Sequence, residues 1–204
     1  GKDSGSLYMY HRESITSNFI FVQRLDGEEE GSIFGANIEV TRNGLLLMVM
    51  VRYVYFFSGE ESGSVFIFSR ENNSDPFGFL QRLDGDAKGD KFGHAMEFSN
   101  NGNLAVVSAP LANREDRSRV GSIYIYRRVE NSRYDLMKRL DGDCVDEQLG
   151  DRVLIKTTET SLNIHAKAQN ICRNIAVHSY TLACKYSSKS QVCSRLIFSV
   201  SGIK

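Results

Sequence analysis

The sequence predicts an all-β fold made of repeated four-stranded antiparallel units, because two phrases recur along the chain at one spacing. Gly-Ser followed by alternating apolar or aromatic residues begins at Gly5, Gly63 and Gly121, and both intervals are 58 residues. Arg-Leu-Asp-Gly is the second phrase, and its three copies lie 58 and then 57 residues apart. A fixed period indicates a protein built from stacked structural repeats.

Two shorter landmarks keep the same register. A large apolar residue followed by glycine recurs as Phe34-Gly35, Phe92-Gly93 and Leu149-Gly150, and Asn43-Gly44 recurs as Asn101-Gly102. Asn-Gly pairs suit hairpin turns, which demand positive φ. Chance is a poor explanation for four landmarks in register, so we interpret about 58 residues as one structural unit.

One period contains four short segments with the chemistry of β-strands. Apolar or aromatic side chains alternate in each segment, and turns rich in Gly, Ser or Asn separate them. Starting from Phe92, the expected strands are 92–98, 103–109, 121–127 and 134–140. Four antiparallel strands per repeated unit is the organisation of a β-propeller blade. We therefore expect a partial β-propeller with about three blades, the last of them degenerate.

The second unit resembles the FG-GAP repeat, which is found in integrin α-chain propellers and in many secreted or cell-surface proteins. The resemblance is carried by Phe92-Gly93, by the run NGNLAVVSAP at 101–110 and by GSIYIY at 121–126. The first unit departs from the pattern, because Met50-Val51-Arg52 stands in place of Ser-Ala-Pro. In the family's phasing the resemblance implies a half blade at 1–33, full blades at 34–91 and 92–148, and a degenerate third blade at 149–204.

The last fifty residues differ in composition from the repeats. From Ile155 onward the chain has seven Lys or Arg and one acidic residue. Segments 172–179 and 190–198 echo the second and third strands of the preceding unit. We interpret this region as a degenerate blade with an insertion of about thirteen residues, and a disordered or non-native tail is the alternative. One disulfide is plausible, with its pairing left open among Cys144, Cys172, Cys184 and Cys193.

No recognisable catalytic or nucleotide-binding motif is present, so we expect no enzyme activity. The four histidines stand in no triad or metal-ligand spacing. The 25 basic and 25 acidic residues balance, which argues against a nucleic-acid partner. The longest apolar run, 45–51, is too short to insert through a membrane, and the chain shows no signal peptide.

Charged loops are the expected binding surface. By the resemblance, the loops between blades share one face with the loops between second and third strands, and binding residues concentrate on such loops. The candidate binding residues are Glu28, Glu29, Glu30, Asp86, Asp90, Arg114, Arg117, Arg119, Asp143 and Asp146.

We expect no cofactor and no dedicated metal site. The resemblance implies calcium in Asp-rich first hairpins of some blades, but segments 41–44 and 99–103 contain no carboxylate. Only weak Ca²⁺ binding by the acidic loops between blades is therefore expected. Asn72-Asn73-Ser74 is a glycosylation sequon, which matters if the chain is secreted.

The expected function is a non-enzymatic binding or adhesion module with a protein or glycan partner, and the FG-GAP resemblance implies a place outside the cell or at its surface. The resemblance also implies one alternative, an accessory propeller of a larger secreted hydrolase or phospholipase. Another is an incomplete fragment without independent function, because about four to eight blades close a propeller. In that case further blades of the same parent chain, or self-association, would cover the open sheet edges.

Overall fold

The structure is a computed structural model that describes residues 4–53, 62–130, 133–157, 161–172, 175–187 and 190–200. Within these ranges every regular element is a β-strand, and hydrogen-bonded strands pair antiparallel. No helix in the described ranges is long and apolar enough to cross a membrane. The prediction of an all-β fold with antiparallel sheets is confirmed.

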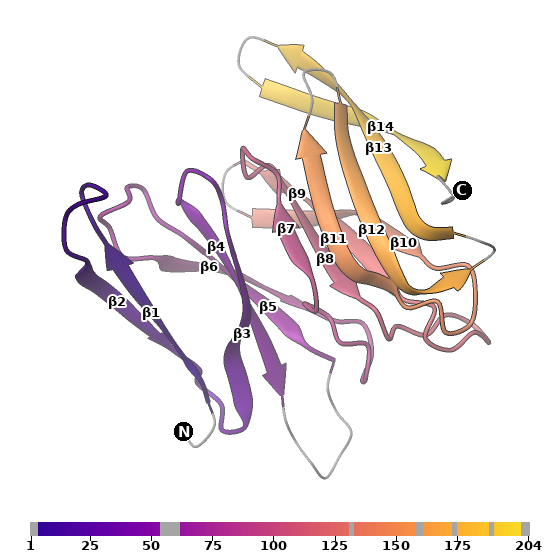
Figure 1. Cartoon of the computed structure of the whole chain (residues 1–204), viewed down its shortest axis with the longest axis horizontal. Coiled ribbons are helices and arrows are strands. Elements are labelled where there is room, and N and C mark those ends of the chain that lie inside the picture. Colours follow the sequence, from indigo (N-terminus) through magenta and orange to yellow (C-terminus); the bar gives the residue numbers. More distant parts are fainter. Residues whose placement is uncertain are drawn as a thin grey trace.

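The strands form four sheets in chain order (Figure 1). The first is a hairpin of β1 (Ser6–His11) and β2 (Ile20–Asp26). The second contains β3 (Ser32–Val40), β4 (Leu46–Tyr53), β5 (Ser64–Ser69) and β6 (Gly78–Asp84). The third contains β7 (Met96–Phe98), β8 (Leu104–Ala109), β9 (Ser122–Val129) and β10 (Arg133–Asp141). The fourth contains β11 (Leu149–Thr157), β12 (Ser161–Cys172), β13 (Ile175–Ser187) and β14 (Ser190–Val200).

Each of the three larger sheets is a meander, in which strands adjacent in sequence are adjacent in space. In the third sheet the four expected strands are present, but the first, β7, is only 3 residues long. A turn precedes it, because Gly93 has a φ of +90° and the His94 N–H donates to the Lys91 carbonyl at 3.2 Å. In this sheet Phe92-Gly93 therefore marks the entry and is not part of a strand, whereas Phe34-Gly35 lies within β3.

In the fourth sheet the C-terminal segments occupy other strand positions than their similarity to the preceding unit predicts. The segment expected to contain an insertion includes β12, which is the second strand of this sheet. Segments 175–179 and 190–198, which echo a second and a third strand, lie in β13 and β14. They are thus the third and fourth strands, one place later than the echoes predict.

Successive sheets pack face to face, so the inner sheets are buried on both sides. All six residues of β8 are buried. Ala105 and Val107 pack in the cluster shared with the second sheet, whereas Leu104 and Val106 pack in the cluster shared with the fourth. This explains why the sequence of β8 is apolar without the polar alternation of a half-exposed strand.

The two repeated phrases meet at the end of each hairpin. In the second sheet the Ser64 hydroxyl and the Arg82 Nε each lie 2.6 Å from the Asp84 Oδ1. The same trio forms in the first and third sheets from Ser6, Arg24 and Asp26 and from Ser122, Arg139 and Asp141. Charge-assisted bonds of this kind are the strong ones, so the phrases tie the last two strands of a sheet together.

Glycine begins the first phrase because the backbone of the next sheet lies against it. Gly63 has a φ of +77°, and a Cβ on it would lie 2.1 Å from the Phe92 carbonyl oxygen. The Phe92 N–H donates to the Ser62 carbonyl at 2.8 Å. Equivalent contacts join Gly5 to Phe34 and Gly121 to Leu149. We call these three backbone contacts the glycine seams.

A glutamine side chain links the sheets a second time. The Gln23 amide accepts from the Phe77 N–H at 2.7 Å and donates to the Phe77 carbonyl at 2.9 Å. Gln81 binds Tyr134 in the same way, at 2.6 and 2.9 Å. Lys138 occupies this repeat position in the third sheet. Lysine carries no acceptor, so it cannot make both bonds.

Gly63→Ala should destabilise the protein more than Gly89→Ala. Gly89 has a similar φ of +83°, but no heavy atom lies within 4 Å of a Cβ placed on it. The left-handed backbone alone costs alanine about 1–2 kcal/mol, which is the loss expected for Gly89→Ala. The overlap at the seam should bring the loss in Gly63→Ala to about 3 kcal/mol or more. Urea denaturation followed by circular dichroism measures both, and equal losses would contradict the proposed role of the seam.

Candidate functional site

The candidate binding residues lie on loops at one end of the sheets, at the lower edge in Figure 1. The loops are β2–β3 (Glu28, Glu29, Glu30), β6–β7 (Asp86, Asp90), β8–β9 (Arg114, Arg117, Arg119) and β10–β11 (Asp143, Asp146). The structure thus gathers loops that are far apart in sequence along one edge.

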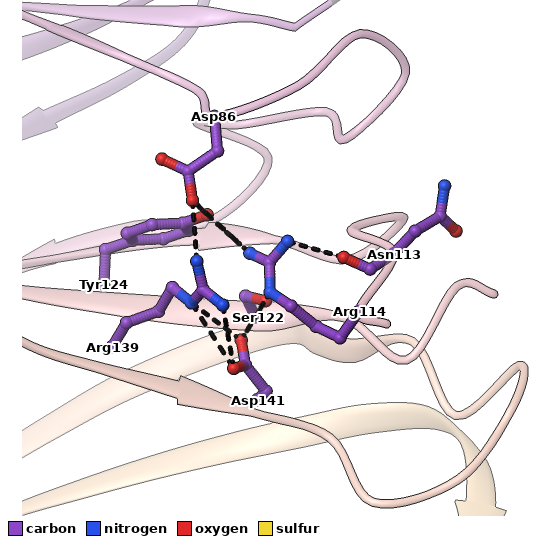
Figure 2. Close-up of polar contacts among 7 residues, drawn as sticks. All are labelled: Asp86, Asn113, Arg114, Ser122, Tyr124, Arg139 and Asp141. Carbon is purple, nitrogen blue, oxygen red and sulfur yellow. Dashed lines mark hydrogen bonds and ion pairs between the residues drawn. The ribbon is translucent and has the colours of Figure 1, made fainter. Parts of the chain in front are cut away.

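Arg114 and Arg139 bind the same two carboxylates in the network shown in Figure 2. The Arg114 Nε lies 2.9 Å from Asp141 Oδ1, and its Nη2 lies 3.5 Å from Asp86 Oδ2. Arg139 lies 2.9 Å from Asp86 and 3.0 Å from Asp141. The Tyr124 hydroxyl accepts from Arg114 at 2.9 Å and donates to Asp86 at 2.8 Å. Two cations and two anions therefore compensate one another within the protein.

Burial and hydrogen bonding act in opposite directions on the acidic groups of this network. Burial alone would raise the pKa of Asp141, but hydrogen bonds from Ser122, Arg139 and Arg114 outweigh it and hold this pKa below its ordinary value. Burial, together with the hydrogen bond to Asp86, raises the pKa of Tyr124. At neutral pH Asp141 is therefore ionised and Tyr124 is protonated, as the hydrogen bonds require.

Sequence reasoning missed Tyr124, Arg139 and Asp141 as members of this cluster. Arg139 and Asp141 belong to the repeated Arg-Leu-Asp-Gly phrase. The repetition indicated that these residues matter to the structure, but it did not indicate which residues they bind. Arg114 comes from a loop with no counterpart phrase in the first unit. The pairing therefore depends on loop geometry that periodicity does not encode.

The other two candidate arginines are also engaged. Arg119 Nε lies 2.6 Å from Asp146 Oδ1, and Arg117 Nη1 donates to the Asp143 carbonyl at 2.9 Å. Backbone bonds run beside these contacts, since the Asp146 N–H donates to the Ser118 carbonyl at 3.0 Å. The β8–β9 and β10–β11 loops therefore support each other.

Asp90 is buried, unlike the other candidates. Its exposed fraction is 1%, and neither carboxylate oxygen makes a hydrogen bond of normal geometry. Burial raises the pKa of Asp90. Glu147 occupies the equivalent position in the β10–β11 loop, where its carboxylate accepts from the backbone N–H groups of Asp143 and Cys144. Asp90 is one methylene shorter, and the backbone groups of Ala87 and Asn113 near its carboxylate only partly offset the effect of burial on its pKa.

The acidic side chains of the β2–β3 loop are exposed. No hydrogen bond or ion pair engages the carboxylates of Glu28, Glu29 and Glu30 in the described part of the chain. The Asp143 carboxylate is exposed and similarly unengaged. These four acids are the candidates that are available to a partner.

The first hairpins, where the FG-GAP resemblance implies calcium in some blades, are closed by their own side chains. The Thr41 hydroxyl donates to Asn43 Oδ1 at 2.8 Å and accepts from the Leu46 N–H at 3.0 Å. Ser99 and Asn101 repeat this arrangement at 2.9 Å. Across the described residues no group of three or more His, Cys, Asp or Glu side chains is placed to hold a metal ion.

Two further sequence features have a clear local setting. Cys144 is disulfide-bonded. The side chains of Cys172, Cys184 and Cys193 lie outside the described residues, so the pairing stays open. Asn72 of the sequon is exposed, and its amide nitrogen donates to Asp75 at 2.9 Å.

A pair of glutamates occupies equivalent positions on β3 and β7, and sequence reasoning missed it. Glu39 and Glu97 are 58 residues apart and both are half-buried. Burial raises both pKa values, and the charge of Glu39 helps to raise the pKa of Glu97 to about 7. The repeat period was the signal that could have identified the pair.

Comparisons with known proteins yield little. No protein-family model matches the chain, and no curated protein matches it. Among solved structures the chain is similar to "Crystal structure of the Saccharomyces cerevisiae Sqt1", with 11% identity and a TM-score of 0.48. The alignment covers 88% of this chain and 39% of Sqt1, so the chain spans about two fifths of the length of that protein. A likeness of this degree does not establish a shared fold or function.

Tyr124→Phe should destabilise the protein by about 1–2 kcal/mol, because it removes a buried hydroxyl that bridges Arg114 and Asp86. Tyr126→Phe is the matched control. Tyr126 is also buried, but its hydroxyl makes no hydrogen bond to the described residues, so we expect a change within about 0.5 kcal/mol. Chemical denaturation compares the two variants, and equal effects would rule out a structural role for the bridging hydroxyl.

Ionisation of Glu97 should lower the free energy of unfolding as pH rises from about 4.5 to about 7. Its folded-state pKa is raised, so the folded protein binds this proton more tightly than the unfolded chain, and the advantage is lost as the group ionises. Glu97→Gln should therefore flatten this part of the profile and be more stable than the wild type at pH 8. Urea denaturation at a series of pH values measures the effect, with Glu71→Gln as an exposed control. An unchanged slope in Glu97→Gln would refute this assignment.

Proposed function

We propose that this chain is part of an FG-GAP β-propeller that binds a protein or glycan partner without catalysing a reaction. The observation that supports it is a rigid edge of repeated loops whose arginines are paired internally while four acids remain unengaged. Paired residues hold the loops in place, and unpaired acids are left to attract a partner. Of the two partner classes, a protein with a basic surface suits this edge better.

Support for the propeller comes from the way successive sheets meet. Each larger sheet is a four-stranded meander, and a glycine seam joins it to the preceding sheet through the same backbone atoms each time. Identical junctions between similar units impose a similar rotation at every step. Such a stack curves in one direction, as the blades of a propeller do.

Support for a place outside the cell comes from Cys144, which is disulfide-bonded. Disulfides persist in oxidising compartments and are rare in reducing ones. The exposed Asn72 would accept a glycan in the same setting, although its amide must first leave Asp75. Both features fit an adhesion or binding protein of the cell surface.

Binding to such a partner should depend on the β2–β3 loop. Glu28→Gln, Glu29→Gln and Glu30→Gln combined should weaken binding at least tenfold and reduce its dependence on salt, because three charges are removed from the docking edge. Affinity capture from extracellular and cell-surface fractions identifies a partner, and surface plasmon resonance at two ionic strengths gives the affinities.

The matched control removes three acids from the opposite end of the sheets. Glu13, Glu71 and Glu130 are exposed and lie in the loops β1–β2, β5–β6 and β9–β10. Changing all three to glutamine alters the net charge equally but leaves the proposed edge intact. Equal loss of binding in both triple variants would show that net charge alone attracts the partner, and would reject this edge as the docking site.

A further inference from the structure

A pocket of about 360 Å³ lies between the β1–β2 hairpin and the second sheet. Four phenylalanines line it, Phe34 from β3, Phe66 and Phe68 from β5 and Phe79 from β6. Its size lies within the range of small-ligand sites, which are mostly apolar with a few placed polar groups. Of its lining residues, only Glu28 also belongs to the proposed docking edge.

The four rings form a closed cycle of edge-to-face contacts. Phe34 contacts Phe66 and Phe68 at centroid distances of 6.2 and 6.3 Å, and Phe79 contacts the same two rings at 5.9 Å each. The interplanar angles are between 71° and 88°. Phe34 and Phe68 are buried, whereas Phe79 is 62% exposed and forms the rim. A cluster of aromatic rings with negative faces is the usual environment for a bound organic cation.

The charges at the pocket favour a cation as well. Glu28 lines it, and its carboxylate has no partner among the described residues. Asp26 also lines it, paired with Arg24 at 2.6 Å. Arg82 is the one cation among the lining residues, and Asp84 compensates its charge at 2.6 Å. The Arg82 guanidinium already lies 5.6 Å from the Phe66 centroid, so this ring system accepts a cation at a face.

The equivalent space between the second and third sheets carries a different set of side chains. Tyr124 stands there at the position of Phe66, and Asp86 at the position of Glu28. The Tyr124 hydroxyl and Arg139 bind Asp86 at 2.8 and 2.9 Å. Asp86 is therefore paired with groups of the protein itself, whereas Phe66 has no hydroxyl to bind Glu28. The unengaged acid beside an aromatic box belongs to the first junction only, among the described residues.

We propose that the pocket formed by Phe34, Phe66, Phe68, Phe79 and Glu28 binds a compact organic cation, with a methylated ammonium group against the rings and its charge balanced by Glu28. The site shares Glu28 with the docking edge, but its four rings lie outside that edge and it needs no macromolecular partner, so Phe79→Ala tests it separately from docking. Methylated ammonium suits it better than a primary amine, since its diffuse charge is lightly hydrated and its methyl groups fill apolar space.

Choline and its uncharged carbon isostere, 3,3-dimethylbutan-1-ol, separate charge from shape. We expect choline to bind the full chain saturably in an NMR titration, with the isostere at least tenfold weaker. Equal affinities would show a merely apolar pocket, and the absence of saturable choline binding would show no site. Either result overturns the proposal.

Variants on the pocket rim locate the binding. Phe79→Ala should weaken choline binding at least tenfold, and Glu28→Gln should weaken it several-fold. Leu136→Ala, at the equivalent position of the third sheet, and Glu30→Gln, two residues from Glu28 on the same loop, should leave it unchanged. Phe79 and Glu28 are both exposed, so neither change should unfold the chain. Choline binding that survives both changes places the cation elsewhere and refutes the assignment.

Discussion

The close backbone contact at the glycine seams is the constraint on which the arrangement of sheets depends. At Gly121 a Cβ would lie 2.2 Å from the Leu149 nitrogen, so only glycine permits this approach. The contact also satisfies the N–H of the residue that enters the next sheet, through the Val120 carbonyl at 2.9 Å. An unpaired N–H in this buried position would be costly, and the seam thus fixes both the distance between sheets and the direction of entry.

The polar contacts near each seam are consequences of that approach. At the end of each hairpin a serine and an arginine bind an aspartate in all three copies, although Asp26 and Asp84 are exposed and only Asp141 is half-buried. Gln81 then joins the outer strand to Tyr134 of the following sheet. Lys138 interrupts this series, so the junction with the fourth sheet lacks the glutamine bonds but keeps the seam, the loop contacts of Arg117 and Arg119, and apolar packing around Leu149 and Ile164. The structure of the repeat thus changes where its sequence departs from the pattern.

The sequence predicted the strands of the third sheet well, apart from the start of β7, because their apolar alternation and their glycines report local structure. It could not predict which charged loop residues pair. Arg114 reaches Asp141 across 27 positions of sequence, and the loop that carries it has no repeated landmark. Asp90 looked like an exposed loop acid, but it is buried. Burial of a loop residue depends on how neighbouring loops fold over it, and a repeat period contains no such information.

Comparing the first two junctions shows how one atom changes the use of a repeated scaffold. Phe66 and Tyr124 occupy the same place, and both rings pack against the phenylalanine that enters the sheet. The hydroxyl of Tyr124 draws Asp86 and Arg114 into a compensated network, and this network occupies the charged groups of the junction. Without that hydroxyl the first junction keeps its rings in contact but leaves Glu28 without a described partner. A scaffold held by backbone contacts tolerates such exchanges, because the seam does not depend on the side chains beside it. Differences between equivalent junctions are therefore where binding properties can arise without loss of the fold.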